Sequence, residues 1–287
     1  MKMAGTSTAC TCWRPQRRLF TGLLLAGAAA PALAAIPECK RSLATKAIPA
    51  SSVEGSARNE YAQLLNGARG QQALAPESHP QLQRLRYIAA RIVPFTAACN
   101  DRAAQWKWEV NLLGSKQLNA FCMPGGKIAF YSGILSQLKL NDDEVAMIMG
   151  HEVAHALLEH ARERMAKSVG TNVGLRVLSA VLGLGNLGDY AAQQGAGLLS
   201  LLYSREDESK ADALGLILAA QAGYDPRAGV TLWQKMTQQT AGKAPPQWLS
   251  THPAGQTRIK DIQARLPKVE PLFVAAGKPE KRFAPAA

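Results

Sequence analysis

Two histidines and a glutamate near the middle of the chain have the types and spacing of a zinc hydrolase site. His151 and His155 stand four positions apart, and Glu152 directly follows the first. On a helix, residues four apart lie one turn above each other, so both imidazoles face the same side. Two such nitrogens suit one tetrahedral zinc ion, and the adjacent carboxylate can act as general base on a water. The spacing favours a catalytic zinc site over two histidines buried in a core helix.

The flanking residues predict that this motif lies on a buried helix. Asn141 and Glu144 have the spacing of a capping box, and further acidic residues lie between them. Apolar residues surround the motif on both sides. We expect one helix over about residues 141–166. His160 stands five positions after His155, so on an unbroken helix it lies off the ligand face and is expected at the surface.

A second segment offers a third ligand. Glu208 and Asp212 stand four positions apart on a helix predicted over residues 204–222, where Ser204 and Asp207 have capping-box spacing. A carboxylate ligand followed by a carboxylate that orients a ligand imidazole has this form. A solvated acidic face is the alternative when this helix is considered alone, because charged residues surround both carboxylates.

The segments before the motif change from helical to strand-like spacing. Residues 80–92 carry apolar side chains at helical spacing, whereas those of 106–112 alternate with polar ones, as in a half-buried strand. Residues 118–122 and 128–131 flank Pro124-Gly125-Gly126 and predict a hairpin. An edge strand here can bind an extended peptide by adding it to the sheet, while support of the metal helix alone is the alternative. Together these patterns predict an α+β fold.

The remaining segments are mostly helical. Helices are expected over residues 56–66, 226–240 and 254–266, and residues 36–55 are expected to be loose. Residues 170–202 are rich in leucine, alanine and glycine, but polar residues interrupt them. This composition argues against a membrane span and leaves two alternatives, a pair of buried helices or a hydrophobic surface held near a membrane.

Composition gives no support for nucleic-acid binding. The 287 residues carry a formal net charge of +12, and four of the positive charges precede residue 36, which leaves +8 on the rest. These charges are scattered, and no basic run is interleaved with aromatic residues. A mild attraction to anionic surfaces, such as a peripheral membrane contact, is compatible with the remaining charge.

The first 35 residues have the form of an export signal. A basic region, Arg14-Pro15-Gln16-Arg17-Arg18, precedes an apolar stretch at 19–30, and Ala32-Leu33-Ala34 offers small residues for cleavage. The arginine pair resembles a twin-arginine signal, and a general-secretion signal is the alternative. The apolar stretch is too short for a confident membrane span. We therefore expect a periplasmic protein whose mature chain begins near residue 36.

Export into an oxidising compartment changes the interpretation of the cysteines. Cys39, Cys99 and Cys122 follow the signal, so one disulfide and one free thiol are expected. The sequence does not fix the pair. It slightly favours Cys39 with Cys99, because Cys122 falls in a predicted buried strand. Cys122 also lacks the local sequence that surrounds the zinc-binding cysteine of peptide deformylases.

Several segments, in this order and spacing, resemble the HtpX-like, CAAX-prenyl-protease-type family of zinc metalloendopeptidases, within the gluzincins. The segments are residues 118–126, 150–155, 204–212, 222–226 and 251–253 with Arg258. The resemblance covers about residues 80–266 and is to the exported, soluble branch. Cys122 departs from the pattern, since an apolar residue is more usual there. Metzincins are excluded, because Leu158 and Ala161 stand where their pattern requires glycine and histidine.

The resemblance implies a mainly helical, zincin-like metalloprotease domain with a small β-sheet beside the metal helix. It implies one zinc ion per chain, a general base, and a carboxylate that orients a ligand imidazole. The implied ligands are His151, His155 and Glu208, the base is Glu152, and the orienting carboxylate is Asp212.

Three further residues of the matching segments have less defined roles. His252 and Arg258 are candidates for stabilising the oxyanion of the reaction, and Arg258 can equally be a structural ion pair. His252 can instead take the fourth zinc position as a latch, or cap the helix expected after it. Asn119 is a candidate substrate contact near the predicted hairpin.

The implied activity is hydrolysis of peptide bonds in unfolded or misassembled envelope proteins, as part of quality control. A latent protease that acts mainly as a chaperone-like binder is the alternative, and a different zinc hydrolase is a third. No tetratricopeptide repeats follow the domain, so no repeat-mediated docking is expected. The expected segments are a signal at 1–35, an N-terminal helical segment at 36–79, the peptidase domain at 80–266 and a mobile tail at 267–287.

Overall fold

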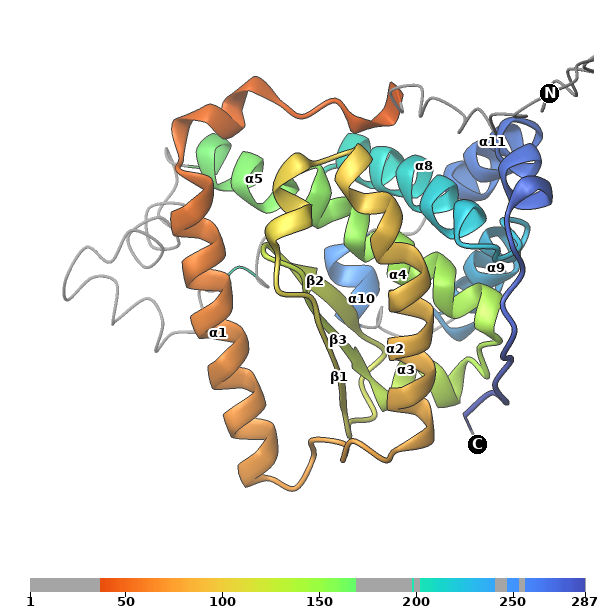
Figure 1. Cartoon of the computed structure of the whole chain (residues 1–287), viewed down its shortest axis with the longest axis horizontal. Coiled ribbons are helices and arrows are strands. Elements are labelled where there is room, and N and C mark those ends of the chain that lie inside the picture. Colours follow the sequence, from red (N-terminus) through yellow and green to blue (C-terminus); the bar gives the residue numbers. More distant parts are fainter. Residues whose placement is uncertain (1–36, 169–197, 199–201, 241–246, 253–255, 287) are drawn as a thin grey trace, which may run out of the picture. The chain divides into compact units, whose positions relative to one another are not determined.

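The computed structural model describes residues 37–168, 198, 202–240, 247–252 and 256–286 (Figure 1). These residues belong to one compact unit, Ala35–Ala287. The expected export signal and nearly all of the apolar stretch at 170–202 lie outside the described residues. In the described part, no helix combines the length and apolar character that crossing a membrane requires.

The described residues form a mainly helical fold with one small sheet, which confirms the predicted α+β class. The strands are β1 (Glu109–Leu113), β2 (Ala120–Met123) and β3 (Lys127–Tyr131). The α-helices are α1 (Ala50–Gly70), α2 (Pro80–Ile92), α3 (Ser132–Gln137), α4 (Asp142–Leu157), α5 (His160–Ser168), α8 (Arg205–Gln221), α9 (Ala228–Thr240), α10 (Gln247–Thr251) and α11 (Gln256–Ala275). Short 3-10 helices are η1 (Pro37–Cys39), η2 (Leu43–Ala47), η3 (Val93–Ala98) and η4 (Asp101–Gln105).

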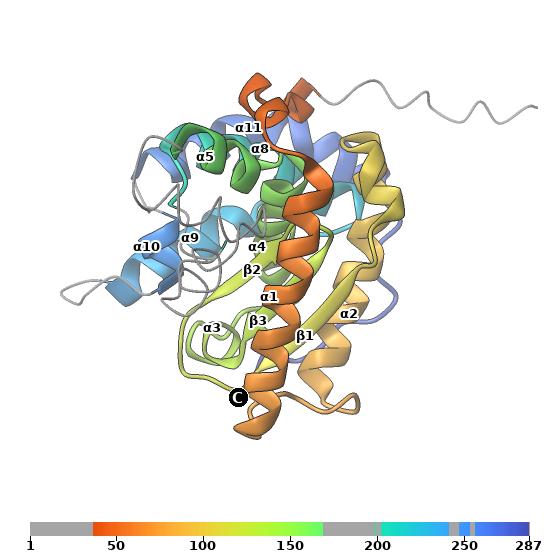
Figure 2. The same ribbon diagram turned by 90° about the vertical axis from the view of Figure 1, so that its left-hand side faces the viewer.

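The sheet has the strand order β1-β3-β2, with β2 and β3 antiparallel and β1 parallel to β3. The predicted hairpin is therefore confirmed. Its turn needs glycine, because Gly125 and Gly126 have φ angles of 85° and 75°, in the left-handed region. Alternate side chains enter two cores. One faces α2 and α4, and the other faces α1, which crosses the sheet in Figure 2.

Helices α4 and α8 pack with their backbones in direct contact. A Cβ atom added to Gly150 would lie 2.6 Å from the Gly215 carbonyl oxygen, and one added to Gly215 would lie 2.7 Å from the His151 nitrogen. Only glycine fits at such a distance. Both helices begin with the predicted capping boxes, at Asn141 and Ser204. The close approach brings the acidic face of α8 against the histidines of α4.

The expected single helix over residues 141–166 is wrong. Helix α4 ends at Leu157, and α5 begins at His160 in a new direction. Between them, Glu159 has a φ angle of 58°, which non-glycine residues rarely adopt. Arg162 holds the Glu159 carboxylate at 2.6 Å, and Arg41 lies 3.8 Å from it. Ion pairs thus hold the Glu159 side chain at the break, and local helix propensity does not reveal them.

The ends of the described chain are more ordered than the sequence predicted. Helix α1 begins at Ala50, inside the segment expected to be loose, and α11 continues to Ala275 through two prolines. The helix expected over residues 254–266 is therefore longer than predicted and continues past residue 267. The residues after α11 contact α4, since the Phe283 N–H donates to Asp142 at 2.8 Å and Arg282 pairs with Asp143 at 2.9 Å. They also contact α2, where the Lys281 N–H donates to the Tyr87 hydroxyl at 3.2 Å.

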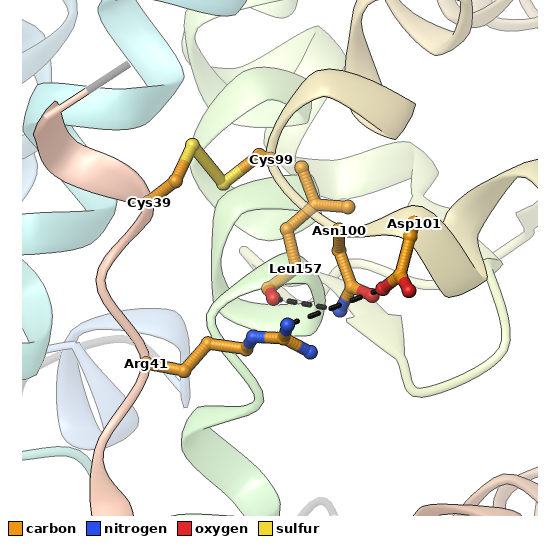
Figure 3. Close-up of a disulfide and its surroundings, with 6 residues drawn as sticks. All are labelled: Cys39, Arg41, Cys99, Asn100, Asp101 and Leu157. Carbon is orange, nitrogen blue, oxygen red and sulfur yellow. Dashed lines mark hydrogen bonds and ion pairs between the residues drawn. A yellow bond between two sulfur atoms is a disulfide. The ribbon is translucent and has the colours of Figure 1, made fainter. Parts of the chain in front are cut away.

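A disulfide joins Cys39 to Cys99, the pair that the sequence slightly favoured, and Cys122 is free and buried (Figure 3). The neighbours of this disulfide reach the end of the metal helix. Asn100 donates from its side-chain amide to the Leu157 carbonyl at 2.9 Å, and both residues are labelled in Figure 3. The disulfide thus fixes the N-terminal segment beside the junction of α4 and α5.

The contact between α4 and α8 predicts the effect of adding one methyl group. We expect Gly215→Ala to lower the free energy of unfolding by about 1–3 kcal/mol, because the new Cβ must displace backbone atoms of α4. Urea denaturation of the zinc-loaded protein measures this change.

Gly67→Ala is the matched control, since a Cβ at Gly67 meets no atom within 4 Å. There the same substitution is expected to raise stability by up to about 1 kcal/mol, through the helix propensity of alanine. Equal unfolding free energies for wild type and Gly215→Ala would contradict the close approach of the two backbones.

Candidate metal centre

Four side chains, three from helices α4 and α8 and one from the residue after α10, converge on one point. His151 and His155 come from α4, Glu208 from α8, and His252 directly follows α10. Their ligand atoms all lie within 4.8 Å of one another, and all four residues are buried. The Nε2 atom of His151 lies 3.1 Å from His155 Nε2 and 3.2 Å from His252 Nδ1. Three imidazoles and a carboxylate facing one point are a donor set that suits zinc.

The three implied ligands therefore lie together, and His252 joins them. Glu208 Oε1 is 2.9 Å from His252 Nδ1 and 3.4 Å from His155 Nε2, and Glu208 Oε2 is 3.5 Å from His151 Nε2. The glutamate thus faces all three imidazoles. Cys122, the disfavoured sulfur ligand, is in neither group of metal donors found among the described residues.

The protonation states of most of these groups suit a metal. Burial raises the pKa of the Glu208 carboxyl, but hydrogen bonds with the three histidines hold it well below its ordinary value. Burial holds the pKa of His155 well below its usual range. Burial also acts to lower the pKa of His151, but hydrogen bonds to Asp212 and Glu208 raise that pKa to about 9. Metal binding at His151 therefore competes with a proton.

A buried ion-pair network contacts two of the donor residues, His151 and Glu208. Asp212 Oδ1 lies 3.0 Å from His151 Nδ1, the nitrogen that faces away from the cluster. Arg258, from α11, donates to both Asp212 oxygens at 2.6 and 2.7 Å and to Glu208 Oε2 at 2.6 Å. Burial acts to raise the pKa of Asp212, but the charge of Arg258 keeps it below its ordinary value. These contacts fit the ion-pair alternative for Arg258.

Glu152 lies beside the cluster and has a partner that sequence reasoning missed. Its Oε1 accepts a hydrogen bond from the Trp248 indole at 2.6 Å and lies 3.6 Å from His252 Nε2. The Trp248 ring stacks on His252, with centroids 5.1 Å apart. Trp248 stands four positions before His252, and this helical spacing is the signal that could have identified it.

A cavity of about 300 Å³ opens in front of Glu152. Strand β2 and the preceding Asn119 line it, together with Tyr203 and His252. Since β2 is an edge strand of the described sheet, the predicted edge strand does lie at the site. An extended peptide along β2 would pass the glutamate and the metal donors.

His160 is not at the surface, so that prediction is wrong. Its side chain is 1% exposed, and its Nδ1 lies 2.9 Å from the Nδ1 of His155. The helix break at Glu159 turns it back towards the metal ligands. Burial lowers the pKa of His160 to about 4. Tyr203, which sequence reasoning also missed, stacks on His155 with centroids 4.1 Å apart.

Two imidazoles from α4 and a carboxylate from α8, with a glutamate beside them, are typical of a zinc metallopeptidase site of the gluzincin type. The sequence profile of peptidase family M48 matches residues 76–266, and the chain belongs to this family.

Curated relatives include the mitochondrial metalloendopeptidase OMA1 of Arabidopsis thaliana, 40% identical over 153 residues, covering 53% of this chain and 30% of that protein. OMA1 of Schizosaccharomyces pombe is 32% identical over 200 residues, or 69% and 56% of the two chains. The beta-barrel assembly-enhancing protease of Yersinia pestis is 25% identical over 273 residues, or 91% and 54%. The chain thus spans less than two thirds of these relatives.

The geometry predicts which residues zinc binding requires. We expect wild type to hold one zinc per chain and His151→Ala, His155→Ala and Glu208→Ala each to lose it, because each removes a donor from the cluster. Metal analysis by mass spectrometry after dialysis measures the zinc content.

His79→Ala is the control, since His79 only caps α2 and should keep full zinc occupancy. Full occupancy in Glu208→Ala would remove Glu208 as a ligand and point to His252 or Cys122 instead.

Proposed function

We propose that this protein is a zinc-dependent endopeptidase in which Glu152 is the general base. The observation that carries the proposal is a glutamate that lines the cleft along β2 and directly follows one of four convergent metal donors. When bound, zinc polarises the scissile carbonyl and lowers the pKa of water. Glu152 accepts a proton from the attacking water and passes it to the leaving amine.

Other residues hold this arrangement. Asp212 accepts the Nδ1–H of His151, which leaves Nε2 as the ligand nitrogen. Arg258 balances the charges of Asp212 and Glu208, so two carboxylates can stay ionised in a buried site. Asn119 lies next to β2 on the cleft wall, where it can contact a peptide laid along the strand.

The proposed substrates are unfolded or misassembled polypeptides of the cell envelope. A cleft along an edge strand suits an extended chain better than a folded domain, because the peptide must offer its backbone to β2. The names of the relatives, a metalloendopeptidase and a beta-barrel assembly-enhancing protease, support protein substrates and a role in quality control. A mainly chaperone-like role is less favoured, since the intact base at Glu152 serves hydrolysis.

The proposed location is the periplasm, after removal of an export signal that ends near residue 35. The Cys39–Cys99 disulfide supports an oxidising compartment. Mass spectrometry of the mature N-terminus tests this location, and an intact Met1 on a cytoplasmic protein would contradict it. Within the M48 family, placement near the HtpX-like, CAAX-prenyl-protease type stays a proposal, supported by the order of the matching motifs.

Glu152→Gln tests the proposed chemistry. We expect this variant to keep its zinc and its fold but to lose at least about 100-fold in kcat, because the amide cannot accept the proton. Digestion of unfolded casein, with metal analysis of the same samples, measures both properties.

The matched control is Glu206→Gln on α8, where the exposed carboxylate pairs only with Lys210 in the described contacts. It should retain wild-type turnover. Cleavage that survives a chelator, or normal turnover in Glu152→Gln, would refute the mechanism.

For His252 we propose the role of a latch in the fourth zinc position. Its Nδ1 belongs to the donor cluster, 2.9 Å from Glu208 and 3.2 Å from His151, and this supports the latch over an oxyanion contact. We therefore expect His252→Ala to raise basal casein cleavage. A fall in kcat would instead indicate transition-state stabilisation. Unchanged kinetics and zinc affinity would leave only a role in capping the next helix.

A further inference from the structure

We propose that His160 is a positioning residue that holds the imidazole of His155 in the orientation needed to bind zinc. The inference rests on the proposed zinc site and concerns how one of its ligands is fixed. It follows from the break between α4 and α5, which no motif in the sequence announces.

The break determines where His160 lies. In a continuous helix a residue five positions after His155 points about 140° away from it. Here the Leu158 N–H still bonds to the Ala154 carbonyl at 2.9 Å, but Glu159 then leaves the helical region and α5 starts anew. The two histidine rings consequently lie with centroids 4.9 Å apart.

The nitrogens involved assign the hydrogen bond. His155 Nε2 faces His151 and Glu208, so Nε2 is the ligand atom and Nδ1 carries the proton. That proton can go only to an acceptor, and His160 Nδ1 lies 2.9 Å away. His160 is therefore the acceptor, with its own proton on Nε2. In this tautomer His160 accepts the Nδ1 proton of His155 and fixes the orientation of its ring, as Asp212 does for His151. We call the hydrogen bond from His155 to His160 the relay.

Two buried carboxylates, Glu163 and Asp207, lie close to His160. Ligand atoms of His160, Glu163 and Asp207 lie within 4.8 Å of one another, and all three residues are buried. The carboxylates are themselves engaged, since Glu163 pairs with Lys167 and Asp207 accepts from the Ser204 N–H at 2.8 Å. These pairings already use oxygen atoms of both carboxylates.

The surroundings keep the relay rigid. The Tyr203 ring packs against the His155 ring, with centroids 4.1 Å apart, and its centroid lies 6.2 Å from that of the His160 ring. Arg162 holds the Glu159 carboxylate at the break, with 2.6 Å between the charged atoms. This ion pair helps to fix the direction of α5, and with it the position of the acceptor.

Two variants separate the hydrogen bond from simple packing. His160→Asn keeps an acceptor close to the Nδ1 position but loses the ring, whereas His160→Phe keeps a ring of similar size without any nitrogen. The measurement is the zinc dissociation constant of the folded mature protein, by competition with a chromogenic chelator. We expect His160→Phe to bind zinc about 10–100-fold more weakly, and His160→Asn to stay within a few-fold of wild type.

Asn100→Ala controls for loss of stability at the same end of α4. It removes a buried hydrogen bond but contacts no ligand, so its melting temperature should fall while its zinc affinity stays near wild type. A parallel loss of zinc affinity in Asn100→Ala would show that rigidity, and not the His160 acceptor, sets the affinity.

Three other outcomes would each contradict either the role of His160 or the zinc site itself. Tighter zinc binding by His160→Phe than by His160→Asn would overturn the relay in favour of packing. Two zinc ions in wild type, one of them lost in both variants, would replace the relay with a second metal site. Zinc retained in His151→Ala would contradict the proposed zinc site itself, so the two failures are distinguishable.

Discussion

The contact between the backbones of α4 and α8 is the constraint on which the rest of the site depends. With a glycine on each helix at the crossing, the carboxylates of α8 come within hydrogen-bonding distance of the histidines of α4. Burying Glu208 and Asp212 so close together demands a compensating charge. Arg258 supplies it from α11, nearly fifty positions further along the chain. Helix α11 thus supplies the positive charge that the buried carboxylates of α8 require.

The short helix α10 connects parts of the site that have different tasks. The Trp248 N–H donates to the Leu118 carbonyl at 3.1 Å, just before β2, and the Trp248 indole binds Glu152. His252, at the other end, lies among the metal donors. A displacement of α10 therefore changes the cleft wall, the base and the metal centre together. The cleft wall, the base and the metal centre are thus all contacted by the residues of one short helical segment.

The local signals predicted much of the fold, because capping and turn chemistry act over a few residues. The capping boxes at Asn141 and Ser204 and the hairpin at Gly125 follow from such patterns. The grouping of Glu208 with the two histidines of α4 was instead implied by the family resemblance, because it joins helices far apart in the sequence. The break at Glu159 has no glycine or proline to mark it, and one of the ion-pair partners of Glu159, Arg41, comes from a distant segment. His160 and Trp248 were misjudged or missed because their partners meet them only in the folded chain.

The Cys39–Cys99 disulfide has a consequence for how self-digestion would be detected. The bond spans 60 positions, and α1 and α2 lie within this loop. A single cut between the two cysteines leaves both pieces covalently joined, with η1 still attached beside the end of α4. Such a nicked molecule keeps the mass of the intact chain plus one water, and it separates into fragments on a gel only after reduction.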